Sequence, residues 1–293
     1  MQYLNVKAKN LNIKEYRDRS ATQEDCETLI DKDTTLLVDG KPVCVYIEKV
    51  PDKVDDLFDC LTRIKYASTT RTSGLVTSSK IFGYAPRNAI RNLPCRAVGL
   101  ASSQPRENET LKKFAGIAER IYSETNQDLS IKHKKMTEDN VIKQYKMSGS
   151  MFTSGIVNHN NPLKYHFDTG NYIGVWSAMF AFKRDVEGGY LSFPEYGIAL
   201  KTSHASLSMF DGQSILHGVT PIKKMKPTAV RYTIVYYSLK SMWSCETPQG
   251  EIERMRTKRS EIELSRTTKS ETPQPSKLQR SRDIPRRKLE KNK

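Results

Sequence analysis

The chain has 293 residues, 37% of them hydrophobic, which suffices for one sizeable domain with a buried core and excludes a collagen. No apolar run approaches the roughly 18 residues of a membrane-spanning helix, and the N-terminus lacks the apolar stretch of a secretory signal, so we expect a nuclear or cytoplasmic protein. The five cysteines are scattered and show no C-x-x-C spacing, which favours reduced, partly buried thiols over a zinc or redox motif.

The net charge of +15 indicates a polyanionic partner, because clustered lysine and arginine side chains attract phosphates and release counterions on contact. Residues 251–293 hold 14 basic and 7 acidic side chains, a balance of +7, so +8 of the total of +15 remains for residues 1–250. The excess of positive charge is therefore not confined to the C-terminal segment.

The N-terminal half has two segments in which apolar side chains recur at steps of three and four residues, as on one face of a helix. The first covers residues 52–66 and the second residues 111–122. We expect the second helix to pack on a sheet, within a helical and partly irregular support that extends over residues 1–149.

From residue 150 to about residue 240 the pattern changes to short runs of β-forming residues, separated by Gly-Gly, Pro and Asp-Gly turn signals. The runs are MFTSGIV, LKYHF, YIGVWSAMFAF, GYLSF, ASLSMF and AVRYTIVYY. Short strands at this density are typical of a sandwich, jelly roll or barrel. The predicted fold class is α+β, with a β-rich core over residues 150–240 and supporting N-terminal helices.

C-terminal to this core, residues 251–264 contain helix formers of mixed charge, and we expect a short exposed helix there. From residue 265 onward the chain is rich in Ser, Thr, Pro, Lys and Arg, with almost no apolar side chains to offset the entropy of ordering. We therefore predict one domain over residues 1–264 and a disordered basic tail over residues 265–293.

His166 and Asp168 are two residues apart in the run LKYHFDTG, so they share one face if this run is a strand. An H-x-D pair alone is a weak signal. A mononuclear iron(II) centre of the facial-triad kind needs a second imidazole and leaves its other positions open, and His217, 49 residues after Asp168, is the candidate. We predict that His166, Asp168 and His217 bind a metal and form the catalytic centre.

Arg231 follows His217 by 14 residues and lies in AVRYTIVYY on the same face as Thr233. A buried arginine in a strand is costly unless it is paired. A dicarboxylate such as 2-oxoglutarate supplies the pair, because a guanidinium holds a carboxylate through two parallel hydrogen bonds and Thr233 adds a hydroxyl donor. We therefore predict that Arg231 and Thr233 bind this co-substrate.

The order H-x-D, distal His and R-x-[ST]-like strand resembles the superfamily of 2-oxoglutarate- and iron(II)-dependent dioxygenases over roughly residues 150–240. GGYLSFPEYG and SMFDGQSILHGVTP are similar to the hairpin and distal-His strands of that superfamily. The resemblance implies a double-stranded β-helix, a hydroxylation reaction and the cofactors Fe(2+), 2-oxoglutarate and O2. Thr233 departs from the commoner Ser but retains the hydroxyl.

Motifs in the N-terminal half narrow the resemblance to one branch of this superfamily. RTSGLVTSSKIFGYAPRNAIRNLPCR (71–96), the 111–122 helix and FTSGIVNHNNPLKYHFD are similar to the branch of TET and J-binding-protein oxygenases, which oxidise the 5-methyl group of pyrimidines in DNA. The resemblance implies DNA as substrate and partner, flipping of the target base into a closed pocket and hydrogen abstraction from its methyl group. Both 5-methylcytosine and thymine remain open as targets, and we expect a monomer.

Four further residues are candidates for contacts with substrate or co-substrate. Arg87, Arg91 and Arg96 lie on a loop rich in Pro and Asn, from which they could reach DNA phosphates, although intramolecular hydrogen bonds explain surface arginines equally well. The resemblance implies that Asn158 hydrogen-bonds 2-oxoglutarate, as its equivalents do in DNA-repair dealkylating members. The segment 158–162 also has the composition of a plain turn.

Two alternatives stay open on the sequence alone. Fold and cofactor do not fix a substrate, so the first alternative is a hydroxylase of proteins or small molecules, against which the charge of residues 1–250 favours nucleic acid. The second is a non-catalytic β-barrel that binds DNA. It does not explain why Arg231 and the three candidate metal ligands occur together.

Overall fold

The computed structural model describes residues 1–17, 19–66, 68–70 and 76–271. Part of the predicted N-terminal motif (71–75) and part of the predicted tail (272–293) therefore lie outside the described residues. The chain divides into two compact units, Met1–Pro248 and Gln249–Lys293. The first unit contains the sheets and all the candidate site residues.

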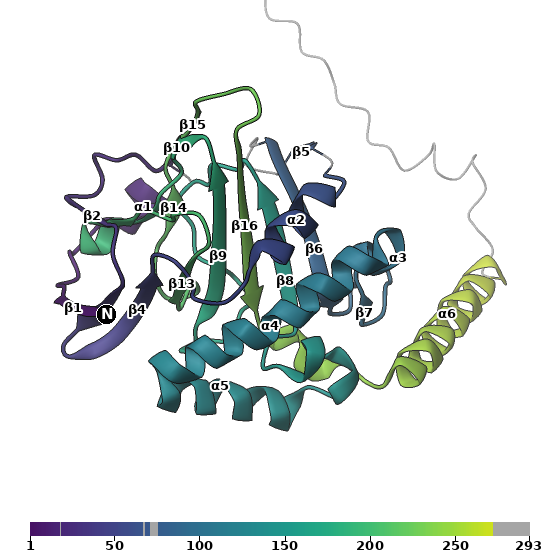
Figure 1. Ribbon diagram of the computed structural model, residues 1–293. Helices are drawn as coiled ribbons and strands as arrows, with labels where there is room; N and C mark the ends of the chain where they lie inside the picture. Colours follow the sequence, from purple (N-terminus) through teal and green to yellow (C-terminus); the bar gives the residue numbers. More distant parts are fainter. Residues whose placement is uncertain (18, 67, 71–75, 272–293) are drawn as a thin grey trace, which may run out of the picture. The chain divides into compact units, whose positions relative to one another are not determined.

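A large mixed sheet forms the centre of the first unit (Figure 1). Among the described residues its strands follow the order β1 (Gln2–Asn5), β3 (Thr34–Val38), β4 (Lys41–Ile47), β13 (Ser206–Phe210), β9 (Ser177–Arg184), β16 (Val230–Tyr237), β8 (Ser154–His159), β6 (Val76–Ala85) and β5 (Ser68–Thr70). A short strand, β7 (Arg96–Ala97), also pairs with β6. The central strands β13, β9, β16 and β8 are antiparallel to one another, so segments far apart in the sequence meet at the centre of the sheet.

A smaller sheet lies against the large one. Its strands follow the order β14 (Gly218–Val219), β11 (Leu191–Phe193), β12 (Ile198–Leu200) and β2 (Thr28–Ile30). A separate ribbon pairs β10 (Val186–Gly188) with β15 (Ile222–Lys224). Buried apolar side chains of both sheets share one core cluster, among them Leu36, Met179, Phe193 and Leu200. The α+β class with two layered sheets agrees with the prediction.

Helices cover the opposite face of the large sheet, where α4 (Pro105–Thr125) runs across the strands in Figure 1. The other helices of the first unit are α1 (Ile13–Tyr16), α2 (Asp55–Arg63), α3 (Gly99–Ser103) and α5 (Gln127–Asn140), with 3-10 turns at Lys143–Tyr145, Met147–Gly149, Pro194–Tyr196 and Lys240–Ser244. Both predicted helices are therefore confirmed as α2 and α4. α4 begins earlier than its apolar spacing indicates because Pro105 starts it, where a missing N–H costs nothing.

The N-terminal half contributes more strands than its helical periodicity predicts, and in this respect the predicted helical support is wrong. β1, β3, β4, β5 and β6 all belong to the large sheet. β3 and β4 form a hairpin whose turn residues Asp39 and Gly40 have φ of 49° and 72°, as a two-residue hairpin turn requires. The Asp-Gly dipeptide between two apolar runs is the sequence signal that could have identified this hairpin.

Two predicted strands are corrected in extent. The run LKYHF forms no regular strand; it is joined to its neighbours by isolated bridges at Lys164 and His166. In YIGVWSAMFAF the strand starts only at Ser177. The preceding residues turn instead, with Gly174 at a φ of 68°, which favours glycine over any side chain. Apolar content in these runs thus reflects burial more than extended pairing.

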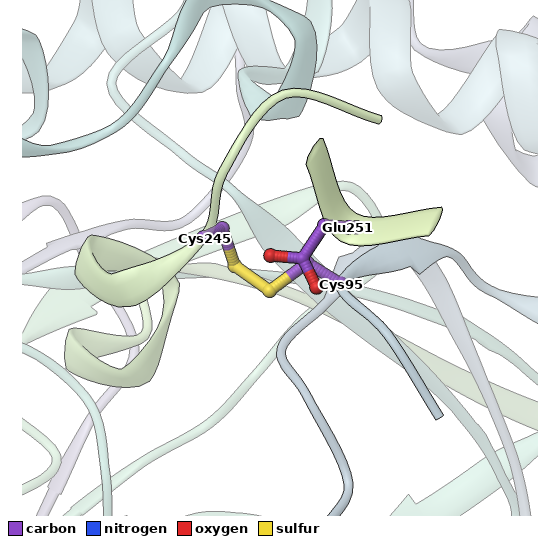
Figure 2. A group of neighbouring side chains, drawn as sticks. All are labelled: Cys95, Cys245 and Glu251. Carbon is purple, nitrogen blue, oxygen red and sulfur yellow. A yellow bond between two sulfur atoms is a disulfide. The ribbon is translucent and has the colours of Figure 1, made fainter. Parts of the chain in front are cut away.

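The prediction that all cysteines are reduced is also wrong. Cys95 and Cys245 form a disulfide with their Cα atoms 5.8 Å apart, drawn as a yellow bond in Figure 2. Their separation of 150 residues in the chain left no local spacing signal. Cys26, Cys44 and Cys60 are free thiols, and burial raises the pKa of each.

The last helix, α6 (Pro248–Glu271), contains the predicted helical segment 251–264 and continues beyond it at both ends. Its side chains are strongly polar, which fits the predicted mixed-charge helix. Across the described part of the chain, every helix is too short or too polar to traverse a lipid bilayer.

Candidate functional site

A cavity of about 330 Å³ opens in the first unit, lined by both sheets. β16 contributes Thr233 and Val235 to its wall, and β9 contributes Met179. The small sheet closes it with Leu191. Because side chains alternate along a strand, Arg231 belongs to the same face of β16 as Thr233 and Val235. The cavity thus lies along the row of side chains that the sequence pattern singled out.

The three predicted metal ligands meet at this cavity. The backbones of His166 and His217 pair in a bridge, with N–H···O distances of 2.9 and 3.1 Å, and the Asp168 N–H donates to the carbonyl of Gly212 at 2.8 Å. Asp168 Oδ1 lies 3.6 Å from His166 Nε2 and 3.8 Å from His217 Nε2. One ligand atom from each of the three residues fits within 4.8 Å of the others. Segments 49 residues apart are thereby brought to one point.

Both imidazoles are oriented by backbone carbonyls. His166 Nδ1 contacts the carbonyl of Lys164 at 2.7 Å, and His217 Nδ1 contacts that of Ile215 at 2.9 Å. A carbonyl only accepts, so each Nδ1 carries a proton, and the Nε2 atom of each ring is the one that faces Asp168. Burial lowers the pKa of His217 to about 4, which keeps its imidazole neutral at physiological pH.

Gly212 leaves room for the carboxylate of this group. A Cβ at this position would lie 2.4 Å from Asp168 Oδ2, closer than real contacts allow. The sequence predicts a turn at the Asp-Gly pair 211–212, but the space that Gly212 makes for Asp168 depends on long-range contacts that a local pattern does not contain. Two imidazoles and one carboxylate that all line the cavity fit an Fe(II) ion with open positions.

Arg231 is almost completely buried, with 1% of its surface exposed. Within the described residues its Nε and Nη2 atoms have no hydrogen-bond partner. Burial lowers its pKa to about 10, so the guanidinium stays charged at neutral pH. Gly189 packs closely on it, since a Cβ there would lie 2.8 Å from Nε. Unpartnered buried donors on a charged group fit an anionic ligand, and a carboxylate of 2-oxoglutarate matches the fork of the guanidinium.

Thr233 and Asn158 are neighbours in the cavity wall. They are cross-strand partners in the β8–β16 register, and Asn158 Nδ2 donates to Thr233 Oγ1 at 3.3 Å. Asn158 Oδ1 accepts from Ser79 Oγ at 2.8 Å. Asn158 is therefore a buried strand residue, and the plain turn that its sequence also allowed starts only at Asn160, which has a φ of 50°.

Of the three candidate DNA-binding arginines, Arg87 and Arg91 lie on the loop between β6 and β7, and Arg96 is the first residue of β7. Arg87 Nη2 donates to Glu246 Oε1 at 2.9 Å, and Arg96 Nη1 donates to the carbonyl of Pro94 at 3.0 Å. The side chain of Arg91 is exposed at the tip of the loop. Both readings made from the sequence, phosphate contact and intramolecular hydrogen bonding, thus remain compatible with this loop.

The chain is similar to a known protein family in sequence and to solved structures in fold. Residues 81–240 match the Tet_JBP family, described as the oxygenase domain of the 2OGFeDO superfamily. The fold is similar to that of NgTET1 in complex with 5mC DNA, with a TM-score of 0.55 and 14% identity over 82% of this chain and 88% of that chain. This likeness confirms the double-stranded β-helix expected from the sequence.

Two further solved structures are similar at a lower level. A 2OG-Fe(II) oxygenase family oxidoreductase from Burkholderia pseudomallei has a TM-score of 0.41 and 10% identity over 67% of this chain and 85% of that chain. OsALKBH1 has a TM-score of 0.40 and 14% identity over 68% of this chain and 97% of that chain. No curated protein sequence matches this chain significantly.

Proposed function

Since the chain belongs to the Tet_JBP family of oxygenase domains, we propose that it hydroxylates the 5-methyl group of a pyrimidine base in DNA. The chain is an Fe(II)- and 2-oxoglutarate-dependent oxygenase that consumes O2, which excludes the non-catalytic β-barrel considered from the sequence. The substrate and the individual site residues are the proposed part. The main support for the site is the buried guanidinium of Arg231, whose Nε and Nη2 atoms find no hydrogen-bond partner among the described residues. Arg231 lies two residues from Thr233 of the cavity wall, and the same cavity is lined by the His-Asp-His group.

His166, Asp168 and His217 would hold the iron, and Arg231 and Thr233 would hold the distal carboxylate of 2-oxoglutarate, with Asn158 orienting the Thr233 hydroxyl. Iron with 2-oxoglutarate and O2 supplies the oxidising power for hydroxylation of a C–H bond.

The protein's own contribution is orientation and exclusion of water. The two backbone carbonyls that accept from the imidazoles keep Nε2 of each ring pointed at one site. Leu191, Phe210 and Val219 line the same cavity with apolar surface, which limits the water that can reach the reacting C–H bond.

DNA is supported as the substrate by three observations. The chain matches the Tet_JBP family of oxygenase domains, the similarly folded NgTET1 was solved in complex with 5mC DNA, and residues 1–250 carry a net charge of +8. A methyl group in duplex DNA reaches an enclosed metal centre only when its base leaves the stack, so we propose base flipping as part of the reaction. Arg87, Arg91 and Arg96 stay candidates for the phosphate contacts that hold the strand meanwhile.

The test is analysis of nucleosides after reaction. The full chain is incubated with Fe(II), 2-oxoglutarate and O2 and one of three matched duplexes, which contain 5-methylcytosine, unmodified cytosine with thymine, or cytosine with uracil in place of thymine. Mass spectrometry should detect a 5-hydroxymethyl base from the first or second duplex, with equimolar succinate, and nothing from the third. His166→Ala is the control. Succinate release without any oxidised base in all three duplexes would contradict the DNA proposal.

A further inference from the structure

Lys183 and Arg231 form an unusual pair of like charges at one end of the candidate site. They are direct partners in the antiparallel register of β9 and β16. Both belong to the cavity face of their strands, because Met179 and Thr233, an even number of residues away, line the cavity. Directly opposed residues have Cβ atoms about 5 Å apart, where like charges destabilise a sheet.

Among the described residues, no carboxylate compensates these charges. In the described parts of the chain neither Lys183 nor Arg231 forms an ion pair with an acidic side chain. Lys183 Nζ donates to the carbonyls of Gly188 at 2.7 Å and Lys201 at 2.9 Å, and it lies 4.9 Å from the centre of the Tyr190 ring. The hydrogen bonds of the ammonium thus go to neutral carbonyl groups, and an anion bound to Arg231 would face two positive charges.

The other charged groups around Lys183 do not neutralise the positive charges of Lys183 and Arg231. A second cavity reaches it from solvent, and its titratable lining residues are Lys183, Asp185, Glu187, Tyr190, Lys201 and His204. Asp185 and Glu187 are already paired with lysines outside the cavity, at 3.1 and 3.2 Å. His204 contacts the backbone carbonyl of Lys183 through Nδ1, and its ring packs against Phe58 and Phe182. This opening gives the Lys183 amine a path for proton exchange that does not pass the metal centre.

Burial, followed by the charges of Arg231 and Lys201, lowers the pKa of Lys183 to about 7. A carboxylate on Arg231 would offset one of these charges and so raise that pKa. We propose that Lys183 is a positioning residue for the co-substrate, which takes up a proton when the distal carboxylate of 2-oxoglutarate binds Arg231. The inference rests on the assignment of Arg231 made under the proposed function.

Lys183 also fixes the wall behind Arg231. By holding the Gly188 carbonyl it anchors the Gly188–Gly189 turn, and Gly189 is the residue packed on the guanidinium. A charged Lys183 therefore contributes both a second positive charge and a firmer wall. Affinity for 2-oxoglutarate should then fall as pH rises through the range where the free amine loses its proton, by about tenfold for a pKa difference of one unit.

The experiment is calorimetric titration of 2-oxoglutarate into the full chain loaded with Mn(II), in two buffers of different ionisation enthalpy at pH 6, 7.5 and 9. Wild type should take up about half a proton at pH 7.5 and bind about tenfold more weakly at pH 9 than at pH 6. Lys183→Gln keeps a donor without the charge, so it should bind weakly at every pH with no proton uptake. Lys183→Arg should bind tightly at every pH, again without uptake.

Lys41→Gln, at an exposed position of β4, is the matched control and should behave as wild type. If wild type binds 2-oxoglutarate without proton uptake, or Lys183→Gln keeps the uptake, the inference is overturned while the co-substrate site stands. If wild type does not bind 2-oxoglutarate at all, the proposed site itself fails. Absence of uptake in wild type overturns the inference without any variant, and if Lys183→Gln does not fold, Lys183→Arg serves instead to show whether the uptake depends on Lys183.

Discussion

Arg231 is the residue whose chemistry is hardest to explain without a ligand. Its guanidinium is buried, charged at neutral pH, and has two nitrogen atoms, Nε and Nη2, that find no acceptor among the described residues. Leaving such donors empty costs more than an ordinary hydrogen bond gains. The carboxylate of a bound co-substrate removes that cost, which is why Arg231 is so informative about the function.

We expect Arg231→Lys to raise the concentration of 2-oxoglutarate needed for half-maximal binding by about 10- to 100-fold, because a single ammonium replaces a fork with two charge-assisted hydrogen bonds. Calorimetry on the Mn(II)-loaded protein measures this directly. Arg184→Lys, on the exposed end of β9, should leave the affinity unchanged. An unaltered affinity in Arg231→Lys would move the co-substrate site elsewhere.

Residue chemistry also explains what could be predicted from the sequence. His166, Asp168, His217 and Arg231 were predicted because few arrangements of these residue types serve another purpose. Lys183 could not be, because its importance depends on the strand register that sets it opposite Arg231, and a local pattern contains no information on long-range pairing.

At the scale of elements, the metal centre depends on a turn. The segment before β14 carries Gly212, whose missing side chain makes room for Asp168, and whose carbonyl accepts from the Asp168 N–H. The centre is thus assembled by loops that the sheets hold in place, and few of its contacts lie within one regular strand.

Gly212→Ala should therefore lower the affinity for Fe(II) or Mn(II) by about 10- to 100-fold, as loss of support around a metal ligand commonly does. Gly99→Ala is the matched control, because a Cβ there meets nothing within 4 Å. Metal affinity is measured by competition with a chelator. Equal affinities in the two variants would show that Asp168 moves freely and needs no such space.

Helices α4 and α5 differ in how well they can be predicted from the sequence. α4 was predicted because its apolar side chains pack against the sheet, whereas α5 was missed because its buried residues are polar. His133 of α5 hydrogen-bonds Ser238, and Thr137 donates to the carbonyl of Met151. A helix that docks through hydrogen bonds lacks the apolar periodicity on which such predictions depend.

For the whole molecule, the buried His133 predicts a loss of stability in acid. Burial lowers its pKa to about 3 in the folded protein, against about 6.5 in an unfolded chain. Below pH 6.5 the unfolded chain binds a proton that the folded chain does not, so the free energy of unfolding falls as pH falls, by up to about 1.4 kcal/mol per pH unit.

Urea denaturation at pH 7, 6 and 5 measures this dependence. His133→Gln should reduce the slope between pH 6.5 and 5, while His204→Gln, at an exposed position, should leave it unchanged. The same slope in wild type and His133→Gln would mean that other groups control the response to acid.

Residues 265–293 contain ten basic and three acidic side chains, so their removal should weaken DNA binding without changing the chemistry. Fluorescence anisotropy across a salt series should show lower affinity and a shallower salt dependence for the truncated chain. Metal and 2-oxoglutarate affinities should stay as in the full chain. A loss of 2-oxoglutarate binding on truncation would instead make this segment part of the catalytic domain.

The central claim is that His166, Asp168 and His217 hold one ferrous ion within reach of a co-substrate bound by Arg231. Under anaerobic conditions, Fe(II) and 2-oxoglutarate added to the full chain should produce the visible charge-transfer absorption of an iron chelate. His166→Ala should abolish it, and Arg231→Lys should restore it only at higher 2-oxoglutarate concentration. An absorption band of normal intensity and affinity in His166→Ala would contradict the account.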